Sequence, residues 1–146
     1  MRALVQRVSQ AQVAVGGEIV GKINRGLLVF VGVGHGDGPI QASWLAEKLV
    51  GLRIFDDDQG KMNLSVADVE GAILLVSQFT LYGDCRRGRR PSFVEAAPPE
   101  EATILYKEVA RQISSRGIEV AMGRFREHME VSLTNDGPVT LWIETP

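Results

Sequence analysis

The sequence is short of the residues from which disulfides and metal sites are built. Cys85 is its only cysteine, and His35 and His128 are its only histidines. A single cysteine excludes an internal disulfide and fits a reducing compartment. Because zinc sites usually draw on several Cys and His residues at short spacing, we expect no metal site.

Long apolar runs are also missing. No segment reaches the roughly 18 consecutive apolar residues of a membrane span, so we expect no membrane association. Residues 1–8 are interrupted by polar side chains and lack the apolar centre of a secretory signal. These two absences predict a cytoplasmic protein.

The sequence has no excess of charge of one sign. The formal net charge is −2, whereas proteins that bind nucleic acids usually show a strong basic excess. We therefore predict no DNA partner, and a contact with RNA would have to come from a local basic cluster. The glycines between residues 32 and 38 lack the Lys and Ser/Thr that follow in a P-loop, so no cofactor is expected.

What is present is an ordinary globular composition. Of the 146 residues, 45% are apolar and 23% are charged, which is close to the averages for soluble globular proteins. A chain of this length fits one continuous core, so residues 1–146 are predicted to form a single domain.

The N-terminal part of the sequence predicts strands. Residues 2–8 and 11–15 partly alternate, and Gly16-Gly17 then resembles a two-residue hairpin turn, which predicts an antiparallel ribbon. Residues 27–33 form a continuous apolar run of strand length. Such a run predicts a central strand that is covered on both faces, here by helices.

Two helices are predicted from apolar stripes. The first begins near Pro39, and its stripe comprises Ile40, Trp44, Leu45, Leu49 and Leu52. The second begins at Pro98-Pro99 and ends before Gly117, with acidic residues first and basic residues last, as the helix dipole favours. Its buried face is expected to comprise Ile104, Leu105, Val109 and Ile113.

Short strands and turns complete the expected fold. The remaining strands are expected at residues 52–55, 72–80, 118–122, 129–133 and 139–143, with turns at 56–60 and 134–138 and an exposed loop at 83–92. Three aspartates in the first turn suggest calcium, but the other ligands of a calcium loop are missing. The order of elements predicts an α/β fold, a single layered domain with mixed and antiparallel β-sheets and two main helices.

One strand opens directly into a polar patch. Residues 72–76 are an apolar run, and Ser77, Gln78 and Thr80 follow it. Open sheets tend to place their chemistry at the ends of strands, and rigidly held N–H donors stabilise a developing oxyanion without reorganising. Thr80 alone is a weak signal, because threonine is favoured in strands for its branched shape.

Two segments taken together are far more specific. Ser77-Gln78-Phe79-Thr80-Leu81-Tyr82 and Asn135-Asp136-Gly137-Pro138-Val139-Thr140 resemble the two signature motifs of the D-aminoacyl-tRNA deacylases, which remove D-amino acids from mischarged tRNA. The resemblance spans the chain, from residues 1–8 through Leu52-Arg53-Ile54-Phe55 and Gly60-Lys61-Met62-Asn63 to the final strand. Both motifs match without a visible departure.

The resemblance implies a homodimer that acts on the aminoacylated 3′ end of tRNA without a cofactor. In this family the glycine-proline step of one subunit, here Gly137-Pro138 in the cis form, enters the active site of the other. It accepts a D-amino acid and collides with the side chain of an L-amino acid. Because glycine has no side chain, glycyl-tRNA mischarged on tRNA(Ala) is an expected second substrate. The substrate-binding residues implied are Gly137, Pro138, Val139, Thr140, Arg7 and Met129.

The resemblance also implies that Ser77, Gln78, Phe79 and Thr80 lie beside the scissile ester. Thr80 is then the nucleophile, and the N–H groups of Phe79 and Thr80 are donors to the oxyanion. A threonine hydroxyl is a poor nucleophile without a base, and neither histidine lies in a motif. In the alternative mechanism the ribose hydroxyl next to the ester orients or activates water, and the protein supplies position and an oxyanion hole.

The basic cluster at residues 86–90 has two interpretations. It contains four arginines, which either form a solvated surface or contact the phosphates of tRNA. Arg7 is likewise either a substrate contact or a solvated or ion-paired side chain, and the thiol of Cys85 has no evident histidine partner. Two other functions stay open: an RNA-binding module in which Tyr82 or Phe93 stacks on bases, and an editing domain.

Overall fold

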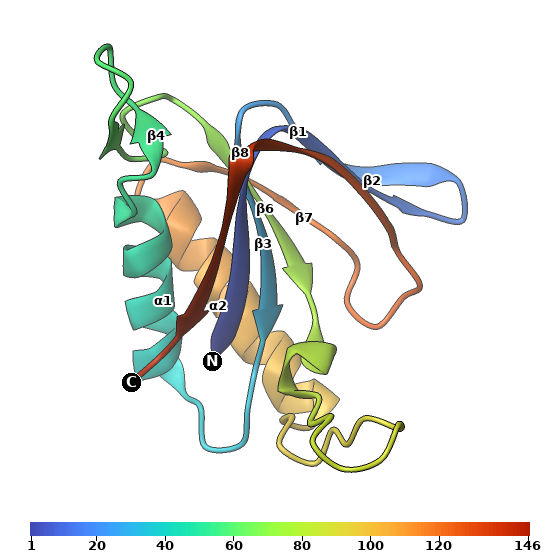
Figure 1. Ribbon diagram of the computed structural model, residues 1–146. Coiled ribbons are helices and arrows are strands. Elements are labelled where there is room, and N and C mark those ends of the chain that lie inside the picture. Colours follow the sequence, from blue (N-terminus) through green and yellow to red (C-terminus); the bar gives the residue numbers. More distant parts are fainter.

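Six strands form one mixed sheet, and two helices pack against it (Figure 1). The computed structural model describes residues 1–146. The strands follow the order β2-β1-β3-β6-β7, with β8 also paired to β1, while β4 and β5 form a separate small sheet. The elements are β1 (Arg2–Val15), β2 (Glu18–Ile23), β3 (Gly26–Gly32), α1 (Pro39–Gly51), β4 (Phe55–Asp56), β5 (Met62–Leu64), β6 (Ala72–Ser77), the short 3₁₀ helix η1 (Phe79–Tyr82), α2 (Pro99–Ser115), β7 (Glu119–Met122) and β8 (Glu130–Glu144).

β1 connects the two parts of the sheet. Its first half pairs with β3, its second half pairs with β2, and β8 runs antiparallel to both halves. The antiparallel ribbon predicted around Gly16-Gly17 is confirmed, because β1 and β2 pair on either side of these two glycines. The alternating runs at residues 2–8 and 11–15 are not two elements of the fold. They are one strand, because β8 provides a continuous partner along them.

The sheet buries a cluster of side chains on each face. Alternate residues of a strand point to opposite faces, so Leu27 and Val29 of β3 pack with both helices, whereas Leu28 packs in a second cluster with Leu74 and Val76. The members of this second cluster all come from strands or their ends. Burial of residues 27–33 on both faces is confirmed, but the prediction that helices cover both faces is wrong.

The helices have the predicted extents but bury fewer of the predicted residues. Leu105, Val109 and Ile113 of α2 are buried as expected. Ile104 is 67% exposed, and Ile40 at the start of α1 is 81% exposed. One residue along a helix is a rotation of about 100°, so Ile104 turns away from the face that Leu105 occupies.

The final segment of the chain is one strand instead of two. The predicted strands 129–133 and 139–143 are the two arms of β8. The predicted turn between them is a bulge, in which residues 136–139 lie opposite Arg7, between the pairs Gln6–Thr140 and Val8–Asn135. The peptide bond of Gly137-Pro138 within this bulge is cis. Pairing with β1 on both sides of the bulge overrides the local turn signal.

Three smaller boundaries also differ from prediction. β6 ends at Ser77, so Thr80 lies in η1 and not in a strand. β4 begins at Phe55, three residues later than the strand predicted from residue 52. β5 was not predicted, because three residues are too few to show a strand period. No helix combines the length and the apolar character needed to span a membrane.

Candidate active site

The polar motif begins where β6 loses its neighbour on one side. β6 lies parallel to β3 and β7, but its pairing with β7 ends at Leu75, whereas its pairing with β3 continues to Ser77. The N–H of Gly123 donates to the carbonyl of Leu75 at 3.0 Å, and no pairing with β7 follows beyond it. On the side of β7, Val76 and Ser77 therefore have no neighbouring strand, and the edge of β6 is open there.

A cavity of about 710 Å³ adjoins this open edge. Its wall is mostly apolar and comes from the ends of β3 and β6, the start of α2 and the segment between β7 and β8. Ser77, Gln78 and Phe79 contribute to the wall, as does Met129 from the far end of the sequence. Thr80 is not part of it. The structure thus brings three predicted motif residues together with one predicted substrate contact.

η1 leaves two backbone donors unused at its start. The N–H of Gln78 still donates to the carbonyl of Val31 at 2.8 Å, as in a strand. The N–H of Leu81 donates to Gln78 at 3.2 Å and is the first to find an acceptor in the turn. Phe79 and Thr80 are the first residues of the helix, so no preceding carbonyl of the helix can accept a hydrogen bond from their N–H groups. Both residues are exposed, so these donors are open to a ligand.

The hydroxyl of Thr80 has no base beside it. Its one side-chain partner is the amide of Gln78, whose Nε2 donates to Oγ1. An amide is not basic enough to take a proton from a hydroxyl near neutral pH. No histidine or carboxylate is within hydrogen-bond distance of Thr80. His128 lines the cavity but makes no hydrogen bond to Thr80. The geometry does not contain the base that a threonine nucleophile requires.

The far end of η1 is held by Tyr82 of the first motif and by Arg2 and Asp37, which the sequence did not single out. Arg2 Nη1 donates to the carbonyl of Leu81 at 3.1 Å, and its guanidinium lies 4.3 Å from the centre of the Tyr82 ring. Burial, with the Asp37 carboxylate nearby, raises the pKa of Tyr82 well above its usual range. The phenol stays protonated and donates to Asp37 Oδ2 at 3.4 Å. A glycine is needed at Gly34, because a Cβ there would lie 2.7 Å from the Tyr82 ring.

The second motif is fixed by a buried arginine. Arg7 is 6% exposed, and its Nε donates to the carbonyl of Asp136 at 2.9 Å. Its Nη1 donates to the carbonyl of Ile54 at 2.7 Å, which ties the bulge to the start of β4. The side chain of Asn135 closes the bulge, since it accepts from the N–H of Val139 and donates to the Val139 carbonyl, both at 3.0 Å.

The two motifs lie far apart within one chain. The bulge is opposite Arg7, which pairs with Leu27 of β3, whereas Ser77 pairs with Val31. Four residues along the strands and three strand spacings across the sheet separate them by roughly 20 Å. Figure 1 shows η1 at one end of the sheet and the bend of β8, beside β4, at the other. Gly137 and Pro138 therefore do not reach the cavity of their own chain.

The comparisons with known proteins agree over the full chain. The model of the D-Tyr-tRNA(Tyr) deacylase family matches residues 4–144. The chain belongs to this family. It is 58% identical to the D-aminoacyl-tRNA deacylase of Thermotoga petrophila, over 99% of this chain and 97% of that protein. It is also 58% identical to the D-aminoacyl-tRNA deacylase of Chloroherpeton thalassium, over 100% and 97% of the two chains. Membership confirms the resemblance and makes the protein a hydrolase of the D-aminoacyl-tRNA deacylase type.

Two solved structures share the fold of this deacylase family. One is described as c-Myc DNA Unwinding Element Binding Protein, with a TM-score of 0.94 and 39% identity over 100% of this chain and 99% of that chain. The other is described as a probable eukaryotic D-amino acid tRNA deacylase, with a TM-score of 0.81 and 18% identity over 97% of each chain. At 18% identity, the second likeness concerns the fold alone.

The remaining substrate-binding residues that the deacylase resemblance implied, Val139 and Thr140, both lie at the bulge of β8. Val139, the last residue of the bulge, is buried, and Thr140 is exposed and accepts from Gln6 Nε2 at 3.1 Å. Phe125 and His128 line the cavity although neither lies in a motif. Their segment has no regular period and is distant in sequence from β6, so only their proximity to Met129 could have indicated them. No three His, Cys, Asp or Glu side chains come together in a way that could hold a metal ion.

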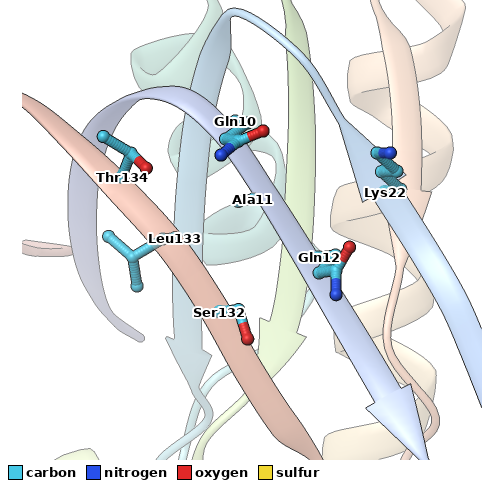
Figure 2. Close-up of a pocket in the computed structure, with 7 residues that line it drawn as sticks. All are labelled: Gln10, Ala11, Gln12, Lys22, Ser132, Leu133 and Thr134. Carbon is cyan, nitrogen blue, oxygen red and sulfur yellow. The ribbon is translucent and has the colours of Figure 1, made fainter. Parts of the chain in front are cut away.

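A second, smaller hollow lies on β1, β2 and β8, away from the first deacylase motif and next to the start of the second (Figure 2). It has a volume of about 220 Å³, and its lining comprises Gln10, Ala11, Gln12, Lys22, Ser132, Leu133 and Thr134. Lys22 is its only ionisable residue, and the hollow contains no nucleophile with an adjacent base. It offers no chemistry comparable to the free N–H groups beside the larger cavity.

Proposed function

We propose that the protein hydrolyses the ester bond of D-aminoacyl-tRNA and releases the free D-amino acid and tRNA. The observation that carries this proposal is the pair of free N–H groups at Phe79 and Thr80 beside a largely apolar cavity. The cavity volume of about 710 Å³ lies in the range of roughly 300–1,000 Å³ that is typical of ligand sites. Such an enzyme acts on charged tRNA, so we expect it in the cytoplasm.

We favour hydrolysis by water over attack by Thr80. The oxygen of a water molecule bonds to the ester carbonyl carbon, and the carbonyl oxygen becomes an oxyanion that accepts hydrogen bonds from Phe79 and Thr80. Collapse of this intermediate breaks the bond to the ribose oxygen, which takes up the proton that the water loses. The free ribose hydroxyl beside the ester orients this water. The absence of a base near Thr80 supports this mechanism, and an oxyanion donor alone contributes roughly 10²–10³ in rate.

The arrangement of the two motifs supports a homodimer. Gly137 and Pro138 are exposed, lie roughly 20 Å from the motif of their own chain, and belong to a strand that pairs only with β1. A second copy can bring its bulge to the open donors of the first. In that site Gly137-Pro138 rejects L-aminoacyl esters by collision with their side chains, since backbone atoms fixed on both sides yield less than a side chain does. Glycyl-tRNA passes this filter.

The test of the function compares three substrates. Purified protein is given D-tyrosyl-tRNA, L-tyrosyl-tRNA and glycyl-tRNA, and release of each amino acid is followed with time. We expect rapid hydrolysis of the D-ester and of glycyl-tRNA and survival of the L-ester. Equal hydrolysis of both enantiomers would remove the chiral filter, and no hydrolysis of any substrate would remove the proposed activity.

The homodimer is tested by mixing two variants. Phe79→Pro removes a catalytic donor, and Gly137→Ala disturbs the bulge. A mixed dimer has two sites. One combines the intact η1 of the Gly137→Ala chain with the intact bulge of the Phe79→Pro chain and is active, and the other combines the two altered parts and is inactive. An excess of Phe79→Pro protein should therefore suppress hydrolysis of L-tyrosyl-tRNA by the Gly137→Ala protein and leave D-tyrosyl-tRNA hydrolysis in place. Unchanged L-hydrolysis would contradict a shared site.

Binding of nucleic acid without turnover is the second candidate. It is favoured by the relative that is described as a DNA unwinding element binding protein and by the arginines at residues 86–90. The formal net charge of −2 is unfavourable for such a function. Multiple turnovers per protein molecule with D-tyrosyl-tRNA would exclude it as the sole function.

A further inference from the structure

The loop between η1 and α2 is a closed structure and not a loose connection. The N–H of Asp84 donates to the carbonyl of Ser92 at 2.8 Å, and the N–H of Ser92 donates back to Asp84 at 3.0 Å. Gly88 near the tip has a φ of +66°, a conformation that other residues rarely adopt. The two reciprocal bonds fix the base of a loop that contains four arginines.

Arg86 differs from the other three arginines of this loop. Its backbone N–H, Nε and Nη2 all donate to the carboxylate of Asp84, at 3.0, 2.9 and 2.8 Å. This guanidinium lowers the pKa of Asp84 to about 2. Asp84 is therefore charged at neutral pH, and the pair is neutral. Arg86 strengthens the base of the loop, and its charge is balanced by Asp84.

Three arginines remain without an acid. Arg87, Arg89 and Arg90 are exposed, and none has a carboxylate within 4.0 Å or a side-chain hydrogen bond. The sequence around them holds three positive charges within four residues, on a protein whose formal net charge is −2. Such a local excess is favourable next to a polyanion and unfavourable in isolation.

The loop lies at the rim of the cavity. Phe93 directly follows it, contacts Phe79 edge to face with ring centres 5.1 Å apart, and lines the cavity. Arg126 lines the same cavity from the segment between β7 and β8 and is also exposed. The acid beside it, Glu127, lies 3.9 Å from Arg124. The base of the loop therefore lies beside the cavity wall, which contains Arg126 as well as Glu127.

We infer that Arg87, Arg89 and Arg90 bind the backbone phosphates of the tRNA acceptor end while its terminal ester lies at Phe79 and Thr80. This inference rests on the proposed function, which supplies the identity of the RNA. Guanidinium groups bind phosphate oxygens in pairs of hydrogen bonds and remain charged at any physiological pH. The contact is made to phosphates and so is independent of base sequence. It supplies affinity for tRNA that the remainder of the protein, which carries a net negative charge, lacks.

The experiment uses one substrate with phosphates and one without. D-tyrosyl-tRNA and the D-tyrosyl ester of adenosine carry the same reacting bond, but only the first can reach the loop. The test protein is Arg87→Gln/Arg89→Gln. The matched control is Arg111→Gln/Arg116→Gln, two exposed arginines near the C-terminal end of α2, roughly 20 Å along that helix from its start beside the cavity.

We expect the loop variant to raise KM for D-tyrosyl-tRNA about tenfold at 0.15 M salt, with kcat unchanged. The slope of log KM against log salt should fall by roughly 1.4–1.8, because each of the two lost phosphate contacts removes about 0.7–0.9. Hydrolysis of the adenosine ester should stay within twofold of the unaltered protein for both variants. The control variant should behave as the unaltered protein with tRNA as well.

Several results would overturn the inference. An unchanged KM and salt slope, with the unaltered protein active on tRNA, would remove the loop from the site. Equal loss on tRNA and on the adenosine ester would assign the loop a structural role. If duplex DNA of equal length competed as well as uncharged tRNA, the loop would bind phosphates in general and would not be specific to the tRNA acceptor end. Failure of the unaltered protein on both esters would instead contradict the proposed function itself.

Discussion

The two motif regions of this protein are held in opposite ways. At η1 the backbone N–H groups of Phe79 and Thr80 are free and exposed, and the supporting contacts from Arg2 and Tyr82 lie at the other end of the turn. At the bulge of β8 the backbone is tied from below by Arg7 and across its ends by Asn135. The first region offers hydrogen bonds to a ligand, and the second uses them to keep its own shape.

This difference matches the two tasks of a selective hydrolase. Stabilising an oxyanion requires donors that have no partner before the substrate arrives. Rejecting an enantiomer by collision requires a surface that does not yield. Changes at η1 should therefore alter the rate and leave the selectivity alone. Changes at the bulge should alter stability and selectivity, and leave the rate on the D-ester nearly intact.

The largest expected effect comes from removing one free donor at η1. Phe79→Pro deletes the N–H of residue 79, and the backbone of Gln78 (φ −146°, ψ 79°) lies outside the α region that a following proline disfavours. Phe79→Ala deletes the ring and keeps the N–H. We expect kcat for D-tyrosyl-tRNA to be lower in Phe79→Pro than in Phe79→Ala by roughly 10²–10³. Similar kcat values for the two variants would show that this donor has no role.

Removal of the buried guanidinium should have the largest effect on stability. Arg7→Ala leaves two carbonyl oxygens without their donor, that of Ile54 in a buried hydrogen bond and that of Asp136 in a part-buried one. We expect the free energy of unfolding to fall by about 3 kcal/mol, measured by urea denaturation. Arg7→Lys keeps the charge but not the fork of donors, so it should recover only part of this loss. A decrease below about 1 kcal/mol for Arg7→Ala would contradict the assigned role.

A smaller loss of stability is expected at the bulge itself. Gly137 has a φ of +146°, and a Cβ there would lie 2.7 Å from Val139 Cγ2 and 3.3 Å from Arg7 Nη2. Gly137→Ala should lower the free energy of unfolding by roughly 1–3 kcal/mol and increase hydrolysis of L-tyrosyl-tRNA. Gly16→Ala is the control, since its φ is also positive but nothing lies within 4 Å of its Cβ. If Gly137→Ala preferred the D-ester over the L-ester as strongly as the unaltered protein does, Gly137 would have no role in chiral selection.

The sequence predicted the first region better than the second for a physical reason. The apolar run 72–76 and the polar residues after it act locally, so the position of the motif at a strand end could be inferred from a few neighbours. The bulge depends on Arg7 and on pairing with β1, both about 130 residues away along the chain. Local turn residues at 134–138 therefore predicted a turn where distant pairing produces a continuous strand.

The cavity shows the same limit. Ser77, Gln78 and Phe79 belong to the motif, but Phe125 and His128 reach the cavity only because β7 stops at Met122, opposite Leu75. Nothing periodic in their segment indicates that contact. Arg2 supports η1 because β1 lies two strands from β6 in the finished sheet. Such residues become candidates only when the strand order is known, and the sequence predicted no strand order.

The smallest expected effect distinguishes the two mechanisms at η1. If Thr80 were the nucleophile, Thr80→Ala would remove the group that bonds to the ester carbon, and nearly all turnover would be lost. In the structure the hydroxyl of Thr80 contacts only the amide of Gln78. This amide cannot take up the proton of the hydroxyl. Water oriented by the ribose hydroxyl does not need this side chain, and Thr80→Ala retains the backbone N–H. We therefore expect kcat to fall less than tenfold, about 1.4 kcal/mol of barrier at most. Thr80→Ser keeps a hydroxyl and should act as the unaltered protein in both mechanisms. The deciding measurement is the single-turnover rate of D-tyrosyl-tRNA hydrolysis by the alanine variant. A loss of rate beyond 10³ with tRNA binding retained would show that Thr80 is the nucleophile.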